Sequence, residues 1–114
     1  MITLPVHDYL TLHSPTQERC GLVLPREVFI EIPNTAEDKA NYFCMSEEDM
    51  SPYSAQAIGT WHTHTHTNCN LTMTDYNSFV ESEFTFHFVI SSAAVSMYSN
   101  SPKGLILVDW RPHG

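Results

Sequence analysis

Basic side chains are the scarcest charged residues in this chain. Its 114 residues include five Lys and Arg against thirteen Asp and Glu, a formal net charge of −8 with neutral His. An acidic surface is a poor partner for nucleic-acid phosphates and for anionic lipid headgroups. We therefore expect no nucleic-acid partner and no membrane partner, and we attribute the acidity to solubility in preference to a basic protein partner.

Cysteine is also sparse, and its pattern is not that of a disulfide framework. The three residues Cys20, Cys44 and Cys69 are an odd number and contain no Cys-x-x-Cys spacing. We therefore expect a reducing, cytoplasmic compartment. Cys20 and Cys44 fit buried small apolar positions, whereas Cys69 is either loop filler or a stray metal ligand.

Long apolar segments are missing as well. No apolar run approaches the roughly 20 residues of a membrane span, and residues 1–10 lack the basic and apolar regions of a signal peptide. We expect neither feature. The length favours a single domain over residues 1–114, and an apolar share of 42% is sufficient for a small core.

Apolar periodicity predicts a mixed α/β (α+β) domain with a central mixed sheet of about six strands and one main helix. Residues 20–24 and 28–32 form a predicted hairpin, because the second run is rich in β-branched and aromatic side chains and a turn containing proline separates the two. The other predicted strands are 42–45, 57–64, 84–91, 93–98 and 105–110, with a turn over 99–104.

Helices are predicted at three places. The first is short, over 5–12, with Leu10 and Leu12 facing inward, and the second is a single turn opened by Ser46. The main helix runs from Thr72 to about Glu83, with apolar residues at helical spacing. Those residues are Met73, Tyr76, Phe79 and Val80. The expected core side chains are Trp61 as core or pocket wall, His87 as a hydrogen-bonded core histidine, and the aromatic residues of 79–88.

A candidate metal site lies in the stretch 59–75, where His62, Thr63 and His64 are followed by ten residues and Asp75. Imidazole nitrogens and a carboxylate are the ligands of catalytic zinc, which uses three protein ligands and leaves a fourth position for water. In a strand the two histidines share a face, with Cα atoms roughly 6.6 Å apart at about 3.3 Å per residue. The following loop can fold back and bring Asp75 in from the next helix.

Each of these residues also has a plainer interpretation. The alternating histidines, including His66, fit an exposed polar strand edge or a tract that sequesters metal without chemistry. We expect His66 in a loop or on the substrate side rather than among the ligands. Thr72 and Asp75 fit a capping box at a helix N-terminus, in which the carboxylate also favours the helix dipole. Glu18, just before an apolar strand, fits an ordinary solvated acid.

Taken together, the four residues resemble the JAMM motif of MPN-domain (JAB-like) metalloproteases, which is a Glu followed by His-x-His, ten residues and Asp. The resemblance assigns Glu18 as general base and His62, His64 and Asp75 as zinc ligands. It places Thr72 where the family has a Ser, whose hydroxyl would donate to the oxyanion. It extends over residues 18–110, and its flanking elements are Glu-x-Cys-Gly at 18–21, Asn-x-Ala at 34–36 and the segment 88–91. These also look like the JAMM domains of phage tail-assembly proteins and of prokaryotic JAB homologues.

The chain departs from the family pattern at two positions of the motif. Thr65 stands where the family usually has Pro, and Thr72 replaces the Ser, keeping the hydroxyl and adding a methyl group. The second, cell-wall peptidase domain that tail-assembly relatives often carry has no counterpart in these residues.

The resemblance implies a Zn²⁺-dependent metallopeptidase or isopeptidase of the bacterial or phage-infected cytoplasm, or of a virion. Its substrate would be a protein or peptide, for example a ubiquitin-like protein, a phage tail protein or a peptidoglycan peptide. The alternative is a phage tail-assembly or virion structural module that keeps the zinc site without requiring catalysis. A zinc nucleobase deaminase is excluded, because its His-x-Glu and Pro-Cys-x-x-Cys motifs are missing. The oligomeric state stays open.

Overall fold

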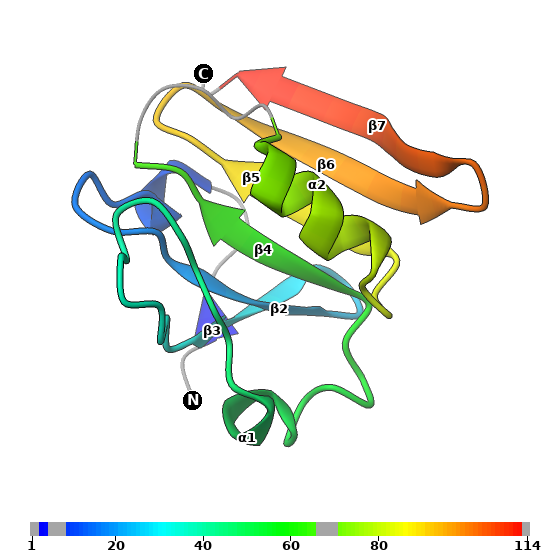
Figure 1. The fold of residues 1–114 in the computed structure, drawn as a ribbon, viewed down its shortest axis with the longest axis horizontal. Helices are drawn as coiled ribbons and strands as arrows, with labels where there is room; N and C mark the ends of the chain where they lie inside the picture. The colour runs from blue at the N-terminus through cyan, green and yellow to red at the C-terminus, as the bar shows by residue number, and fades with distance from the viewer. Residues whose placement is uncertain (1–2, 5–8, 66–70, 113–114) are drawn as a thin grey trace.

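A seven-stranded mixed sheet forms the centre of the molecule, and helix α2 covers one of its faces (Figure 1). The computed structural model describes residues 3–4, 9–65 and 71–112. The strand order is β1-β3-β2-β4-β5-β6-β7. Within the described ranges, β4 and β5 are the only parallel neighbours. The first strand has two residues, so six strands are of ordinary length and the expected mixed α+β class is confirmed.

The elements are β1 (Thr3–Leu4), the 3₁₀ helix η1 (Tyr9–Leu12), β2 (Cys20–Leu24), β3 (Val28–Ile32), α1 (Glu47–Met50), β4 (Gly59–Thr63), α2 (Met73–Val80), β5 (Phe86–Ile90), β6 (Ala94–Ser101) and β7 (Gly104–Pro112).

β2 and β3 form the predicted hairpin, with Cys20 opposite Ile32 at its open end. Two consecutive residues of the turn, Arg26 and Glu27, have positive φ angles of 68° and 55°. A left-handed backbone at both residues reverses the chain within a short loop. β2 also pairs with β4 on its other side, and there Cys20 lies opposite His62. The hairpin therefore fixes the chain that precedes β2 against the end of β4.

Trp61 in β4 reaches across β2 to β3. Its Nε1 atom donates a hydrogen bond of 3.0 Å to the Ile30 carbonyl oxygen, and its ring stacks on Phe29 with the centroids 5.8 Å apart. The indole passes over Gly21, where a Cβ atom would overlap both the Ile30 oxygen and the indole nitrogen. Trp61 is fully buried, so its predicted core position is confirmed.

β4 is shorter than the predicted 57–64, because residues 57 and 58 precede it and His64 follows it. His64 nevertheless stays on the sheet, since its backbone N–H donates to the Ile90 oxygen at 2.7 Å. The connection from β4 to the parallel strand β5 contains α2, as parallel pairing requires a crossover. Phe79 anchors this helix in a buried cluster with Val89, Ala94 and Tyr98.

In the first half of the chain one predicted strand is wrong, and the predicted first helix is present in part as η1, with only one of its two inward side chains. Residues 42–45 form no strand, because the Asn34 side chain binds their backbone in place of a neighbouring strand. It accepts from the Cys44 N–H and donates to the Tyr42 oxygen. In η1, Leu12 is buried but Leu10 is 43% exposed, since a separation of two residues on a 3₁₀ helix with three residues per turn points the side chains apart. Residues 5–8 of the predicted first helix lie outside the described part.

α1 begins after its predicted N-cap Ser46, which accepts from the Asp49 N–H. α2 also begins as predicted, with Thr72 as N-cap, but it ends at Val80 instead of Glu83. The side-chain amide of Asn100 donates to the carbonyl oxygens of residues 79, 82 and 84 and thereby holds the chain that follows the helix. Of the four apolar residues at helical spacing, only Phe79 is buried. The others, Met73, Tyr76 and Val80, are 74%, 42% and 43% exposed.

The β6–β7 turn is much tighter than the predicted 99–104. The strands extend to Ser101 and from Gly104, which leaves Pro102 and Lys103 between them. The Ser101 hydroxyl donates to the Gly104 oxygen and accepts from the Lys103 N–H, so one side chain closes the turn.

Of the cysteines, Cys20 is buried as expected, whereas Cys44 is exposed and that prediction is wrong. The loop around Cys44 is held by polar contacts to Asn34, and its neighbour Phe43 packs on His62 while Cys44 itself faces outward. His66 and Cys69 lie outside the described residues, so their predicted roles stay predictions. Over the ranges that the structure describes, no helix is long and apolar enough to cross a bilayer.

Candidate metal centre

His62 and His64 converge at the end of β4, as the strand spacing predicts. Both side chains are buried, with exposures of 0% and 1%. Their Nε2 atoms lie 3.2 Å apart. The alternative of an exposed polar strand edge is therefore wrong for these two residues.

Asp75 comes to the same point from the first turn of α2. Its Oδ2 atom lies 2.9 Å from Nε2 of His64 and 3.2 Å from Nε2 of His62. The Thr72 hydroxyl accepts from the Asp75 N–H at 3.0 Å, so the helix cap holds the backbone that carries the carboxylate. The structure thus brings together His62, His64 and Asp75, which are 13 residues apart at most in sequence, from two different elements.

The three donor atoms fit one tetrahedral ion. Zinc bonds of about 2.0–2.2 Å to nitrogen and oxygen place two ligand atoms of a tetrahedron roughly 3.3–3.6 Å apart. The observed separations are 2.9–3.2 Å, so a small outward movement of each side chain would make room for the ion. This group of two imidazoles and one carboxylate can therefore hold a metal.

The protonation states also suit a divalent cation. Burial lowers the pKa of His62, although its contact with Asp75 opposes this, so the imidazole is kept in its neutral, ligating form. Burial works against ionisation of Asp75, but the hydrogen bonds of His62 and His64 to the carboxylate outweigh it and hold the pKa of that carboxyl below its usual range. Neutral imidazoles beside an ionised carboxylate are the state in which these groups bind metal.

Aromatic rings position His62. Its Nδ1 atom is buried and has no hydrogen-bond partner among the residues described. Instead Phe43 stacks on the imidazole with centroids 4.4 Å apart and planes at 21°, and Phe79 meets it edge-on at 5.7 Å. Sequence reasoning missed Phe43, because it assigned residues 42–45 to a strand, and no sequence signal pointed to this contact.

Glu18 lies beside the two histidines because of strand register. β2 and β4 pair antiparallel with Cys20 opposite His62, and continuing this register by two residues places Glu18 opposite His64. The intervening pair is held by two bonds between Arg19 and Thr63. Glu18 is only 6% exposed, so the interpretation as a solvated acid is wrong.

The surroundings of Glu18 favour its neutral form. Burial, aided by the negative charges of Asp75 and Asp38 and opposed by His64, raises the pKa of Glu18 to about 7. Its backbone is fixed at both ends: the N–H donates to the Lys39 oxygen at 2.6 Å, and the carbonyl accepts from the Asn34 amide at 2.8 Å. The Asn-x-Ala segment at 34–36 therefore ties the following loop to the backbone of Glu18.

Two cavities border the candidate site, one at Glu18 and the other at Thr72. The first, of about 480 Å³, is lined by Glu18, Asn34 and Lys39. Arg19 also lines this cavity, and its guanidinium forms two ion-pair contacts of 2.7 Å with the Glu31 carboxylate. The other, of about 320 Å³, is lined by Leu71, Thr72, Met73 and Tyr76. Both general-base and oxyanion candidates therefore line space that a substrate can enter.

His87 only partly matches its prediction as a hydrogen-bonded core histidine. It is fully buried, its ring stacks on Phe79 at 4.1 Å, and its Nδ1 atom is 2.7 Å from the Thr60 hydroxyl. Its Nε2 atom, however, has no hydrogen bond to any described residue. Burial lowers the pKa of His87 to about 4, so the ring is neutral.

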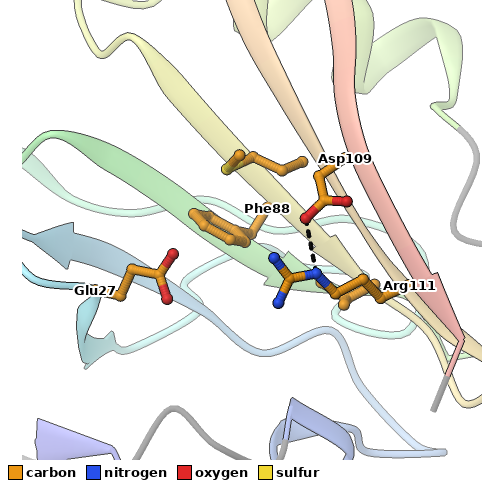
Figure 2. A pocket seen from close by; sticks show the side chains of 6 residues that line it. Glu27, Phe88, Asp109 and Arg111 are labelled. Carbon is orange, nitrogen blue, oxygen red and sulfur yellow. Dashed lines mark ion pairs between the residues drawn. The ribbon is translucent and has the colours of Figure 1, made fainter. Parts of the chain in front are cut away.

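A further small pocket lies on the face of the sheet opposite α2, away from the metal ligands. It encloses about 30 Å³ between Glu27, Phe88, Val95, Met97, Asp109 and Arg111. Figure 2 shows that Asp109 pairs with the Arg111 guanidinium, at 2.8 Å. Space for about one water and no cluster of catalytic groups make this pocket a packing feature.

Comparisons with known proteins show the fold alone. No protein-family model matches the sequence, and neither does any curated protein. The structure is similar to the solution structure of protein DSY2949 from Desulfitobacterium hafniense, with a TM-score of 0.69 and 15% sequence identity. The similarity covers 88% of this chain and 82% of that one. The chain therefore shares its small α+β fold with a bacterial protein.

Proposed function

We propose that this chain is a JAMM-type zinc metallopeptidase or isopeptidase, with zinc held by His62, His64 and Asp75. The observation that carries the proposal is the convergence of three buried ligand atoms within 3.2 Å of one another, with the buried carboxyl of Glu18 opposite His64. In this proposal the β2–β4 register brings Glu18 to the histidines, and the N-cap of α2 holds the backbone of Asp75. The three ligands and the base would then belong to one hydrolytic site. The MPN-domain fold is part of the same proposal and is compatible with the mixed sheet and single main helix.

Glu18 supplies the proton transfers of the proposed mechanism. Zinc, when bound, supplies a Lewis acid that acidifies a water molecule and polarises the carbonyl group to be cleaved. Glu18 would accept a proton from the attacking water and would later donate that proton to the departing amine. In the metal-free protein, burial already raises the pKa of Glu18 to about 7, so this carboxyl can hold a proton near neutral pH.

Thr72 is the proposed donor to the oxygen that gains negative charge. Its oxygen is already used as an acceptor for the Asp75 N–H, so its hydroxyl hydrogen remains available for a substrate. The substrate is proposed to be a protein or peptide, with a ubiquitin-like protein and a phage tail protein as candidates by resemblance. The proposed place of action is the bacterial or infected-cell cytoplasm.

The test combines metal analysis with hydrolysis of a panel of isopeptide-linked and linear peptides. We expect one zinc per chain in the wild type and loss of most zinc in His64→Ala. Glu18→Gln should keep zinc and fold but lose hydrolysis by a factor on the order of 10²–10⁴. Glu48→Gln, an exposed carboxyl of α1, removes the same charge and should change neither property.

Three outcomes would contradict parts of this proposal. Full zinc occupancy in His64→Ala would refute the ligand set. Hydrolysis by Glu18→Gln at the wild-type rate would refute the mechanism. A zinc-loaded wild type that cleaves none of the panel would favour the structural assembly module over the enzyme.

A further inference from the structure

The outer edge of β7 is an unpaired strand edge. β7 is the last strand in the sheet order and pairs with β6 alone among the described strands (Figure 1). With nine residues it is also the longest of them. An edge of this length presents a row of outward backbone N–H and C=O groups that can template another strand.

The side chains of β7 do not protect this edge. Ile106, Leu107, Val108 and Trp110 are 50%, 54%, 48% and 54% exposed. Because neighbouring residues of a strand point to opposite faces, the exposed apolar surface lies on both sides of the edge. Natural edges are usually blocked by lysine, by proline, by short length or by a β-bulge. β7 has proline only as its final residue, and a register shift opposite Met97 and Tyr98 leaves Val108 as one bulged residue, with regularly paired residues on both sides of it.

The apolar surface continues from β7 onto α2. Leu107 pairs across the ladder with Tyr98, and Trp110 pairs with Ser96, so both lie on the sheet face that α2 covers. On the helix, Met73, Tyr76 and Val80 are the exposed apolar residues, and Tyr76 stands next to Gly104 at the start of β7. We call these residues of α2 and β7 together the β7 edge patch.

We propose that the β7 edge patch is a homodimer interface, in which two copies of β7 pair antiparallel about a two-fold axis and join both sheets into one. A partner must bring an unpaired strand of similar length that is apolar on both faces. The β7 strand of a second copy has these properties. Such a two-fold interface uses the same patch on both subunits. An axis perpendicular to the sheet also keeps both α2 helices on one face, so that Leu107 and Trp110 of both copies line the floor between them.

Charge favours this edge over the rest of the surface. The whole chain carries −8, which repels a second copy. The segment Gly104–Pro112 has one acid and one base, Asp109 and Arg111, and these pair with each other at 2.8 Å (Figure 2). The β7 edge is therefore a locally neutral surface on an acidic protein, where two copies meet with little local repulsion.

The patch is also large enough for a specific dimer. At about half of the 150–250 Å² that an aromatic side chain can bury, Tyr76 and Trp110 supply on the order of 200 Å² per copy. Five further exposed apolar side chains and a nine-residue backbone ladder add to this. Their sum approaches the roughly 800 Å² per partner of a standard interface.

The test is the mass of the 114-residue protein in solution across a wide range of concentration. We expect twice the 13.0 kDa chain mass at high concentration, with dissociation on dilution and stronger association in higher salt, which screens the like charges. The double variant Ile106→Lys/Leu107→Lys places a lysine on each face of the edge, because these residues pair regularly with Ser99 and Tyr98, and it should be monomeric. Both residues are half exposed, so the fold should survive.

The matched control is Ala55→Lys/Gln56→Lys, at exposed positions after α1, which makes the same charge change and should still dimerise. Since added lysines reduce the net repulsion, loss of the dimer in the edge variant would not be an effect of net charge.

Hydrogen exchange of the wild type gives a readout independent of any variant: β7 amides should exchange more slowly in concentrated than in dilute samples. A monomer at every concentration, or a dimer that the edge lysines leave intact, would overturn the proposal. A monomer whose edge binds a foreign peptide strand would likewise assign the patch to another partner.

Discussion

The aromatic rings of Phe43 and Phe79 hold His62 in the site. The Phe43 contact is the one that could not be predicted from the sequence. The ligand types and their spacing follow from strand alternation, so His62 and His64 could be predicted to converge. The stacking of Phe43 on His62 could not, because Phe43 reaches the site only through a loop whose backbone is bound by Asn34. Local sequence patterns do not encode such a long-range polar contact.

Glu18 should make the metal-free protein less stable as the pH rises. Its pKa is raised to about 7 in the folded state by burial, with Asp75 and Asp38 adding to the effect, whereas an unfolded glutamate titrates near 4.3. The folded state thus binds the proton more tightly, and this stabilisation is complete below the unfolded pKa and lost as the pH rises through about 7. The free energy of unfolding of the wild type, relative to Glu18→Gln, should fall by on the order of 3–4 kcal/mol between acid and mildly alkaline pH.

Urea unfolding at a series of pH values in the presence of a chelator measures this difference. Glu48→Gln, the exposed control, should follow the wild type at each pH. Parallel curves for the wild type and Glu18→Gln would show that the folded protein does not hold Glu18 in its neutral form.

At the scale of elements, the N-cap of α2 links helix stability to the ligand set. The Thr72 hydroxyl accepts from the N–H of Asp75, so Thr72→Ala should destabilise the protein by about 1 kcal/mol. It should also weaken zinc binding, because the backbone that carries Asp75 loses its constraint. Thr72→Ser keeps the hydroxyl and should retain both properties. Chemical denaturation and zinc titration of the three proteins provide the measurement, and equal stability of the alanine and serine variants would contradict the capping role.

Elements with local signals could be predicted, and those that depend on distant partners could not. The β2–β3 hairpin follows from two β-rich runs around a turn, and the start of α2 follows from its cap. The end of α2 depends on the Asn100 amide, which comes from β6. The apolar spacing along α2 predicted the helix itself, but it did not show which of these side chains are covered, and Met73, Tyr76 and Val80 are exposed.

At the scale of the whole molecule, a bound metal would link the sheet to the helix that crosses over it. The ligands come from the end of β4 and the start of α2, so binding requires the folded state and stabilises it. With free zinc at about one hundred times its Kd, the gain is about 2.7 kcal/mol, or on the order of 10 °C in Tm for a domain of this size. Thermal unfolding with zinc and with chelator measures the gain. His64→Ala should show no zinc-dependent shift, and an equal shift in that variant would place the stabilising ion elsewhere.

The position of Glu18 shows how the complete molecule assembles the site from a predictable motif. Glu18 is 46 residues before His64 in the sequence, and their proximity depends on the β2–β4 register that pairs Cys20 with His62. Sequence periodicity predicts both strands but does not say which strands are neighbours. Only resemblance to a known motif placed Glu18 with the histidines, and the strand order gives the physical reason for that placement.

The indole of Trp61 crossing over Gly21 has a consequence for how this fold can vary during evolution. A side chain at position 21 would occupy the space of both the indole nitrogen and the Ile30 carbonyl oxygen that accepts from it. Substitution of the glycine therefore becomes tolerable only after the tryptophan has been lost and the strands have moved apart. Position 61 must therefore change before position 21, so among descendants of this chain a non-glycine at 21 should never coexist with tryptophan at 61.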